Sequence, residues 1–497
     1  MAGRELMELY LRENSLVRQH FDSYNKFIDF GLQEAIDRVG LIKPPVEGFE
    51  LKLDRVRLDK PTIIEADGSR RYLKPSECRL RNLTYAAPLF LELIPIFNGV
   101  EKRMHAEVYI GEMPIMVKSK NCHLHGMTDD ELIEAGEDPS DPGGNFIING
   151  SERVLISIED LAPNKIITTR EKDDVIAKVF STRHGFRARC VVSRDKAGVL
   201  HLTFPASTRD LPLIPILKIL GIETDRQIID MFAGASETVR NDILLNLEVD
   251  ETTSRDEALD FIGRRVAPGQ PIEFRIKRVE HILDNYLLPH ISLVPDKRLE
   301  KSVYLCTMAE RAILVASGEL NNDDKDHYGN KRIRLAGDLM DELFRYALQF
   351  LVKDISYQAS RADARGRKLV VQTLVRPDAL TDRIRYAMAT GNWIAGQTGV
   401  SQLLDRTSYL STLSHLRRVI SPLNRRHPHF EARDLHGTHW GKICPDETPE
   451  GPSCSLVKNM ALLSAISIGC DENEMSEVVK CMGVSLAKNP SKIKIEK

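Results

Sequence analysis

The sequence predicts an α+β protein of several domains, with mixed β-sheets and helices. Stretches of strand alternation flank an α-rich island, and long amphipathic helices follow it. The length of 497 residues suggests about three domains at roughly 150 residues each. The composition is 42% hydrophobic and 28% charged, which is the balance of ordinary globular domains and excludes disorder for most of the chain.

The N-terminal part begins with helical periodicity and then changes to strands. Apolar residues recur at near-helical spacing over residues 4–40, and Gly40 ends the run. Residues 47–120 have the pattern of strands. Within them, residues 106–118 alternate twice between apolar and polar positions, and Gly111 between the two halves indicates a bulge.

The middle of the chain has β character followed by short helices. Residues 137–145 (EDPSDPGGN) are typical of a loop, and residues 146–157 predict a hairpin about an Asn-Gly turn. Residues 165–205 predict further strands, with residues 194–198 at a hairpin tip. Residues 209–265 predict short helices that form a domain of their own.

Two longer helices are predicted in the second half. Residues 336–358 form an amphipathic pattern, and residues 378–390 form another that stops at Gly391. Ser254 and Glu257 have the spacing of a capping box ahead of a shorter helix. The residues predicted to face inward on the first long helix are Leu339, Leu343, Ala347, Phe350, Leu351 and Ile355. The last ten residues are polar and basic and have the pattern of a frayed tail.

Overall charge gives no argument for nucleic-acid or membrane binding. Lys and Arg number 69 against 72 Asp and Glu, so the net charge is −3 and only local clusters are informative. No apolar run reaches the roughly 18 residues that span a bilayer, and the charged N-terminus lacks a signal-peptide core. Eight scattered cysteines without a Cys-x-x-Cys pair indicate reduced thiols in a cytoplasmic protein without a zinc ribbon.

No self-sufficient catalytic motif is present in the sequence. Phosphate-binding loops, the dinucleotide fingerprint, the zinc-protease motif and the nucleophile elbow are all missing. Asp323, Asp324 and Asp326 make the nearest approach to a magnesium site, which leaves a metal-dependent hydrolase as one hypothesis. Three acids in a polar loop are more typical of a solvated surface, so we predict no metal site.

Residues 391–458 carry the strongest chemical pattern. From 406 to 433 every basic residue apart from histidine is arginine, and Glu431 is the one acid. The guanidinium fork suits bidentate phosphate contacts, so the segment predicts nucleic-acid binding, with a solvated charged face as the alternative. The six arginines are Arg406, Arg417, Arg418, Arg425, Arg426 and Arg433.

Two local features accompany these arginines. Pro422 to Pro428 has the composition of an exposed loop that presents Arg425 and Arg426. Thr448-Pro449-Glu450-Gly451 predicts a tight turn that fixes the Glu450 carboxylate, although an ordinary surface turn has the same spacing.

A resemblance to a known family is carried by two long runs. They are GVSQLLDRTSYLSTLSHLRRVISPL (399–423) and FEARDLHGTHWGKICPDETPEGPSCSLVKN (430–459), and they are similar to the fork region of the second-largest subunit of multisubunit DNA-directed RNA polymerases. Four upstream runs resemble the family's protrusion and its border with the lobe, in the same order. These are RLRNLTYAAPL (79–89), YIGEMPIMVKSKNCHL (109–124), GGNFIINGSERVLISIEDLAPN (143–164) and DKDHYGNKRIRLAGDLM (324–340).

The resemblance implies a domain organisation. Nothing in the chain matches the second half of the family's subunit, so the chain resembles the N-terminal half of the split archaeal subunit, B double prime. A truncation of an intact subunit is the alternative. The implied domains are a protrusion in two segments (1–160 and 321–390), a lobe (161–320), and the fork with the start of the following region (391–497).

The resemblance also implies a function. The chain would be a subunit of DNA-directed RNA polymerase, a nucleotidyltransferase that is active only as a multisubunit complex. It would form one wall of the DNA cleft and a fork that contacts the RNA–DNA hybrid and downstream DNA. The assembled enzyme uses Mg²⁺, the aspartates that hold it lie in other chains, and this chain binds no cofactor. The implied partners are the complementary C-terminal half (B prime), the largest subunit, small subunits, the DNA template and the hybrid.

Site residues follow from the same match. Gln402, Asp405, His415, Arg417 and Arg418 would line the RNA path, with Arg406 and Arg433 as further nucleic-acid contacts. In addition, Arg425 and Arg426 would lie near the downstream fork, and Glu450 would approach the active centre without binding metal. For His415 a packed core histidine is the alternative.

A stand-alone nucleic-acid-binding regulatory protein is the competing function. It would account for residues 406–433 but not for the ordered upstream matches. We predict a cytoplasmic, nucleoid-associated protein.

Overall fold

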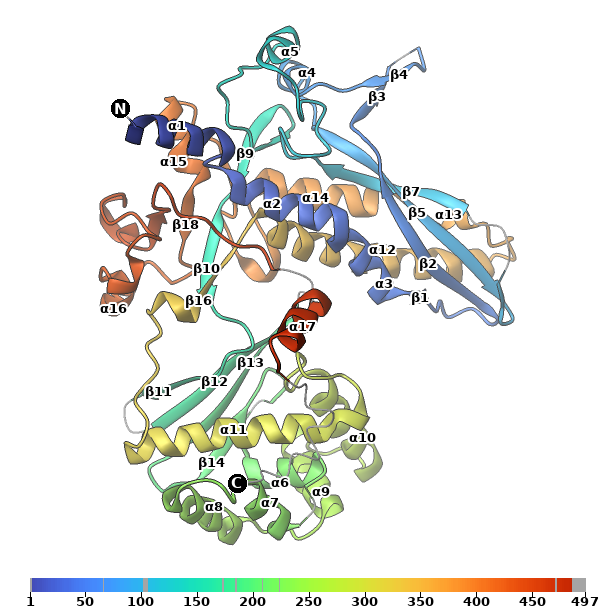
Figure 1. Cartoon of the computed structure of the whole chain (residues 1–497). Helices are drawn as coiled ribbons and strands as arrows, with labels where there is room; N and C mark the ends of the chain where they lie inside the picture. Colours follow the sequence, from blue (N-terminus) through green and yellow to red (C-terminus); the bar gives the residue numbers. More distant parts are fainter. Residues whose placement is uncertain are drawn as a thin grey trace. The chain divides into compact units, whose positions relative to one another are not determined.

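The chain is described from a computed structural model (Figure 1). The described residues are 2–65, 67–101, 106–171, 174–183, 186–207, 209–222, 224–469 and 472–484. They form two compact units. The first comprises Met1–Asp160 and Ile333–Gly469, and the second comprises Leu161–Arg332 and Cys470–Lys497. The assignment of protrusion, lobe and fork to these segments stays a prediction, and the tail predicted at 488–497 lies outside the described residues.

The N-terminal residues of the first unit form several helices rather than one. They are α1 (Ala2–Glu13), α2 (Arg18–Lys26), the π-helical turn η1 (Phe27–Gly31) and α3 (Leu32–Val39). The single helix predicted over 4–40 was therefore wrong at residues 14–17. The chain turns there because Val17 is fully buried in a small apolar cluster with Val154, Ile156 and Leu416.

A five-stranded antiparallel sheet follows in the first unit. Its strands are β1 (Leu41–Ile42), β2 (Phe49–Leu58), β5 (Ala86–Phe97), β6 (Val100–Glu101) and β7 (Ala106–Pro114). The bulge predicted at Gly111 is confirmed, because the β5–β7 register shifts between Leu89 and Phe90, which pair with Gly111 and Tyr109. Gly111 has φ of 146°, and a Cβ there would lie 2.8 Å from Thr381 Oγ1, so only glycine fits.

Shorter elements complete this part of the first unit. They are the hairpin β3 (Thr62–Ile64) and β4 (Arg70–Tyr72), α4 (Pro75–Leu80), α5 (Asp129–Glu134), β8 (Phe146–Ile148) and β9 (Ser151–Leu155). The predicted Asn-Gly hairpin is confirmed between β8 and β9, where Asn149 and Gly150 both have positive φ, 50° and 77°. β17 (Ser401–Leu403) pairs with the other edge of β9.

A four-stranded mixed sheet carries the chain toward the Arg-rich segment. Its order is β16 (Lys331–Arg334), β10 (Ser157–Leu161), β18 (Arg418–Ile420) and β19 (Val457–Asn459). β10 and β18 are parallel, and β18 and β19 are antiparallel. Arg418 therefore stands at the start of a central strand.

Three helices pack beside the five-stranded sheet: α12 (Ala336–Asp363), α13 (Val371–Leu374) and α14 (Asp378–Thr390). The predicted end of α14 at Gly391 is confirmed by its left-handed φ of 77°. Five of the six residues predicted to face inward on α12 are buried, but Phe350 is only partly buried and lies at the edge of the surface. Near the start of α12, Gly337 N–H donates to Ser23 Oγ of α2 at 2.7 Å.

The second unit is a five-stranded antiparallel sheet covered by helices. The strands run in sequence order as β11 (Ile167–Glu171), β12 (Asp174–Arg183), β13 (Phe186–Arg194), β14 (Leu200–Thr203) and β15 (Leu211–Pro212). The hairpin tip predicted at 194–198 is confirmed between β13 and β14. The long helix α11 (Arg298–Ser317) packs across β11, β12 and β13.

The short helices predicted over 209–265 are confirmed, but the prediction that they form a domain of their own was wrong, because they share one apolar core with the five-stranded sheet. They are α6 (Leu213–Ile219), α7 (Asp225–Met231), α8 (Glu237–Val249) and α9 (Arg255–Val266), and α10 (Ile272–Asn285) follows them. Only half of the predicted capping box forms. Ser254 accepts the Glu257 N–H at 3.3 Å, but the Glu257 carboxylate accepts from Thr253 instead of the Ser254 N–H. A further helix, α17, spans Glu472–Cys481.

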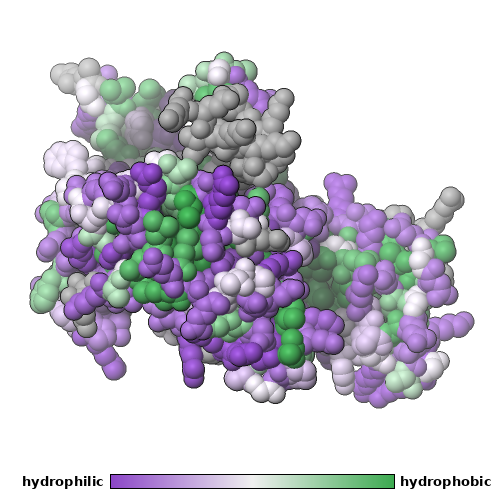
Figure 2. All heavy atoms as spheres, turned by 90° about the horizontal axis from the view of Figure 1, so that it is seen from below, coloured by the Kyte–Doolittle hydropathy of each residue, from purple (hydrophilic) through white to green (hydrophobic). Residues whose placement is uncertain are grey.

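Each unit has its own apolar core. The core of the first unit lies between its five-stranded sheet and α2, α3, α12 and α14, whereas that of the second lies between its sheet and α6 to α11. Many large apolar side chains nevertheless remain exposed, including Leu6, Leu9, Leu462 and Leu463. Figure 2 shows one face of the molecule, on which apolar patches are framed by hydrophilic residues.

Candidate nucleic-acid interface

The Arg-rich segment is built from short elements of the first unit. After η4 (Ile394–Gly396) and β17 come α15 (Tyr409–Leu416), β18, α16 (Phe430–Arg433), η5 (Gly437–His439), η6 (Gly451–Ser453) and β19. Ser408 caps α15 by accepting the Ser411 N–H at 3.1 Å. Leu413 and Leu416 anchor the helix in the small apolar cluster beneath it.

His415 orients Gln402 through a chain of hydrogen bonds. The Asp405 N–H donates to His415 Nδ1 at 3.1 Å, so the proton of the neutral ring resides on Nε2, which lies 3.1 Å from Gln402 Oε1. Gln402 Nε2 in turn donates to Gly399 O at 2.9 Å. Burial, together with a smaller effect of the nearby Arg418 guanidinium, lowers the pKa of His415 to about 4. His415 is 5% exposed, which matches the packed-histidine alternative.

A hollow of 430 Å³ opens beside Gln402. Arg418 from β18 and Arg425 from the loop after it line the hollow, together with Glu447. Ser414 donates a hydrogen bond to Glu447 and holds this carboxylate. The rest of the lining comprises Ile420, Thr448, Pro449, Ser453, Val457, Lys458 and Asn459.

One residue that lines this hollow, Lys458, belongs to a buried ion pair. Lys458 Nζ of β19 lies 3.1 Å from both carboxylate oxygens of Glu159 on β10, and the two side chains are only 7% and 2% exposed. The charge of Lys458 is thereby neutralised within the fold. Two guanidinium groups, Arg418 and Arg425, therefore face one carboxylate, Glu447, and the hollow favours an anion.

Arg406 lies in an ion-pair network instead of the hollow. Its guanidinium donates to Glu152 (Nε–Oε2 2.6 Å) and to Asp141 (Nη2–Oδ2 3.0 Å). Partial burial opposes the charge of Arg406, but the hydrogen bonds that its guanidinium donates to these two carboxylates outweigh that effect and raise its pKa. Arg79 donates to Glu152 as well, at 2.8 Å, so Arg406 joins the segment to β9 and its neighbours.

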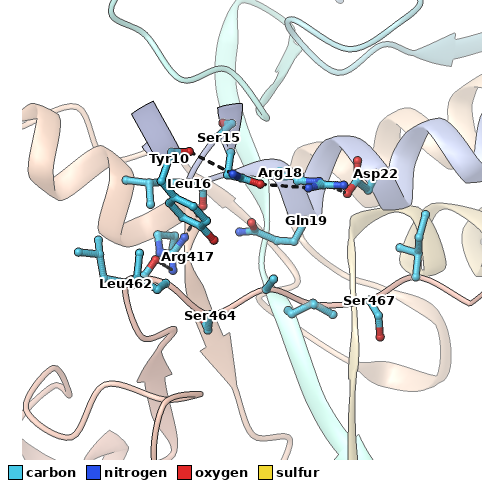
Figure 3. Close-up of a pocket in the computed structure, with 15 residues that line it drawn as sticks. Tyr10, Ser15, Leu16, Arg18, Gln19, Asp22, Arg417, Leu462, Ser464 and Ser467 are labelled. Carbon is cyan, nitrogen blue, oxygen red and sulfur yellow. Dashed lines mark hydrogen bonds and ion pairs between the residues drawn. The ribbon is translucent and has the colours of Figure 1, made fainter. Parts of the chain in front are cut away.

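Arg417 points away from the hollow, toward α1 and α2 (Figure 3). Arg417 is only 5% exposed, and its guanidinium donates to the backbone carbonyls of Leu16, Ala461 and Leu462. It lies beside a second hollow of 440 Å³ between the α1–α2 junction and residues 462–468. The two adjacent arginines thus serve different parts of the unit.

The remaining predicted residues are mostly at the surface. Arg425 and Arg426 are exposed in the loop from 422 to 428, as predicted. In contrast, Arg433 donates to the carbonyls of Pro428, Cys454 and Pro452 and ties α16 to the turn at 451–455.

Asp405 supports the loop before α15. Its carboxylate accepts from Ser411 and from Thr407 Oγ1 and N–H, and these bonds lower the pKa of Asp405. Its side chain is therefore committed to local structure.

Glu450 is exposed immediately before the short helix η6. The loop that carries it is closed at its base by Thr448, whose Oγ1 donates to Val457 O at 3.0 Å and accepts from Ser455 N–H at 2.8 Å. The tight turn predicted over 448–451 is therefore not where the sequence placed it: Glu450 is extended, with φ of −77° and ψ of 163°, and the short turn η6 begins after it.

The other candidate chemistry finds no support in the described residues. Within them, no group of three or more His, Cys, Asp or Glu side chains is arranged to hold a metal ion. Asp323 is bonded to Thr168 N–H and Arg311, and Asp326 pairs with Lys331. None of the helices in the described part of the chain has the length and apolarity needed to cross a membrane.

Comparison with known protein families identifies the fold. The family model described as RNA polymerase beta subunit matches residues 15–382, and the one described as RNA polymerase Rpb2, domain 3 matches residues 402–466. The chain belongs to the RNA polymerase beta subunit family. It is a subunit of a nucleotidyltransferase complex, as the resemblance implied.

Three relatives of this RNA polymerase subunit, all archaeal, have two different lengths. It is 49% identical to DNA-directed RNA polymerase subunit Rpo2N of Methanocaldococcus jannaschii, with 97% of this chain and 99% of the relative covered. It is 45% identical to Rpo2N of Halobacterium salinarum, at 97% and 95% coverage. Against DNA-directed RNA polymerase subunit Rpo2 of Saccharolobus shibatae it is 48% identical, but covers 43% of that protein. The match to the N-terminal half of a split subunit is confirmed.

Sequence reasoning missed most of the residues that line the hollow. Glu447, Lys458 and Asn459 line it beside the predicted Gln402, Arg418 and Arg425. The available signal was Lys458, which in a strand shares one face with the apolar residues Leu456 and Met460, because a charge on an apolar face requires a buried partner.

Proposed function

We propose that this subunit contacts the RNA–DNA hybrid and downstream DNA through the hollow and the exposed loop beside it. The observation that carries the proposal is the convergence of Gln402, Arg418 and Arg425 on one anion-favouring hollow. Guanidinium groups bind phosphates without reading bases, which suits an enzyme that must copy any sequence.

The predicted residues divide into two roles in this proposal. Arg418, Arg425 and Arg426 contact phosphates, and Gln402 contacts the nucleic acid from a fixed position. The others hold the segment in shape, because their polar groups are already bonded within the protein. These positioning residues are Asp405, Arg406, His415, Arg417 and Arg433.

Glu450 approaches the active centre from its closed loop in the assembled enzyme. Its exposure leaves the carboxylate available to a cation of a partner chain. The Mg²⁺ ions supply the stabilisation of the attacking and leaving oxygens, and their ligands belong to other subunits. What this chain contributes is the position of one carboxylate.

The proposed partners are the complementary C-terminal half and the largest and small subunits. Exposed apolar residues on α1 and at 462–463 support such contacts: Leu6 is 68% exposed, and Leu9, Leu462 and Leu463 are each 54% exposed. In this proposal the first unit contains the protrusion and most of the fork, and the second unit contains the lobe. The enzyme works on the genome in the cytoplasm, at the nucleoid.

The proposal is tested in polymerase reconstituted with the complementary half and the other subunits. We expect Arg418→Ser with Arg425→Ser to leave assembly intact but to shorten the lifetime of an elongation complex at least 10-fold at 0.5 M salt. The matched control is Arg240→Ser, an exposed arginine of α8 in the second unit. An unchanged lifetime would refute the phosphate contacts, and RNA extension that does not require this chain would favour a regulatory binder.

A further inference from the structure

The long helix α12 carries an aromatic and basic stripe on its exposed side. Tyr346, Phe350, Lys353, Tyr357 and Arg361 follow one another at spacings of three and four residues, which places them on one face of the helix. Tyr346 and Tyr357 are 39% and 60% exposed, and Phe350 is the residue that the amphipathic pattern wrongly placed inside.

The neighbouring helix α14 widens this stripe. The Arg383 guanidinium stacks on the Phe350 ring at 3.5 Å from its centroid, and Lys353 Nζ lies 5.5 Å from the same centroid. The Tyr346 ring packs edge-on against the Phe350 ring, with 4.9 Å between the two ring centroids. Tyr386, three residues beyond Arg383, is 60% exposed. These residues of α12 and α14 are called the aromatic–basic face below.

The charge of this region is opposite to that of the whole chain. Between Tyr346 and Thr390 eight Lys and Arg stand against four Asp, a net charge of +4, whereas the chain as a whole is −3. Asp354 is moreover paired with Arg376, whose Nε lies 2.8 Å from its Oδ2. Arg365, Arg367 and Lys368 extend the positive charge beyond the end of α12, and all three are exposed.

We propose that the aromatic–basic face binds a nucleic-acid backbone independently of sequence. Cations set between exposed rings suit a phosphate chain, because guanidinium and ammonium groups take phosphates, tyrosine hydroxyls donate to them, and ring faces stack on unpaired bases. Tyr346 to Arg361 extends about 22 Å along the helix, which is several phosphates of a strand. None of these residues lines the hollow beside Gln402, so the proposal for the aromatic–basic face can be tested independently of the proposal for the hollow.

The full-length chain tests the proposal by fluorescence anisotropy with three labelled 30-mers: single-stranded DNA, single-stranded RNA and duplex DNA. We expect Lys353→Glu with Arg361→Glu to weaken binding of at least one of them 10-fold or more at 50 mM salt. The slope of log K against log salt should fall by about 1.4 to 1.8, for two lost phosphate contacts. Arg240→Glu on α8 is the charge-matched control outside this face.

Two further measurements fix the chemistry and the independence of the site. The double variant Tyr357→Ala with Tyr386→Ala should bind single strands more weakly. If the corresponding double Phe variant binds normally, the two tyrosines act by stacking their rings on bases. If the Ala and Phe variants lose equal affinity, the tyrosines act through their hydroxyl groups. The Lys353 and Arg361 substitutions are also made in a chain that already carries Arg425→Ser and Arg426→Ser. This comparison distinguishes binding by the aromatic–basic face from binding by the loop near the hollow. Affinity equal to that of the unsubstituted chain, or a loss no larger than with Arg240→Glu, overturns the proposal.

Discussion

The backbone N–H of Asp405 donates to His415 Nδ1 at 3.1 Å, and this bond decides which ring nitrogen of His415 carries the proton. The neutral ring then offers Nε2–H to Gln402 Oε1. A charged ring would lose the Asp405 bond, because both nitrogens would be donors. The placement of Gln402 in the hollow therefore depends on His415 staying neutral.

This dependence predicts a pH effect on stability. The pKa of His415 falls from 6.5 to about 4 on folding, so the unfolded chain binds more protons between these values and stability is lost as pH falls from 6.5 toward 4. His415→Gln should lose less stability across this window. Urea unfolding at pH 7.5, 6.5, 5.5 and 4.5 gives the free energy of unfolding of the two proteins. Equal losses of stability in both proteins as the pH falls would contradict the prediction.

Arg417 and Arg418 should behave differently although they are adjacent. Arg417→Met leaves three backbone carbonyls without their donor and should destabilise the first unit by roughly 2 to 4 kcal/mol. Arg418→Met should leave the urea midpoint nearly unchanged and weaken the elongation complex instead. Equal destabilisation by both substitutions would show that Arg418 is structural as well.

The Lys458–Glu159 pair predicts non-additive substitutions. Lys458→Met strands a carboxylate that is 2% exposed and should cost about 3 to 5 kcal/mol. Adding Glu159→Leu removes the stranded charge and should recover most of that loss. A double-mutant cycle in urea measures the coupling, and additive effects would argue against a buried charged pair.

Gly337 marks the closest approach of α12 to α2. A Cβ at this residue would lie 1.9 Å from Ser23 O, so Gly337→Ala should destabilise by more than about 3 kcal/mol. Gly3→Ala on α1 is the control, since its Cβ meets no atom within 4 Å and helix propensity alone should stabilise it by up to about 1 kcal/mol. Thermal unfolding of both variants checks the prediction. It is wrong if Gly337→Ala has the same melting temperature as the unsubstituted protein.

Glu450→Gln removes a charge but keeps the shape of the side chain. The loop is closed by Thr448, so assembly of the polymerase should be unaffected. Single-nucleotide addition by the reconstituted enzyme should slow by about 10-fold, or about 1.4 kcal/mol in the barrier. A variant that fails to assemble would show that Glu450 has an architectural role.

Local features of the fold could be predicted from the sequence, and distant contacts could not. The Asn149-Gly150 turn and the Gly111 bulge follow from backbone freedom at single residues. Arg417 reaches Leu16 across 401 residues, and Arg406 reaches Glu152 across 254. No periodicity encodes such contacts, so all six arginines look alike in the sequence, although the structure ties three of them to the protein itself. The break at Val17 was missed for the same reason.

The first unit is interrupted in the sequence by residues 161–332 of the second unit, and this order matters during synthesis. Residues 1–160 leave the ribosome before β17 and β18, which later cover edges of β9 and β10, and before β19, which covers the edge of β18. Until then the nascent chain exposes unpaired strand edges, which are sites of misassociation. The inserted residues 161–332 have all their strands and core within one stretch and can fold while the first unit waits for its C-terminal part. Chaperone demand should therefore fall sharply once residue 460 has emerged.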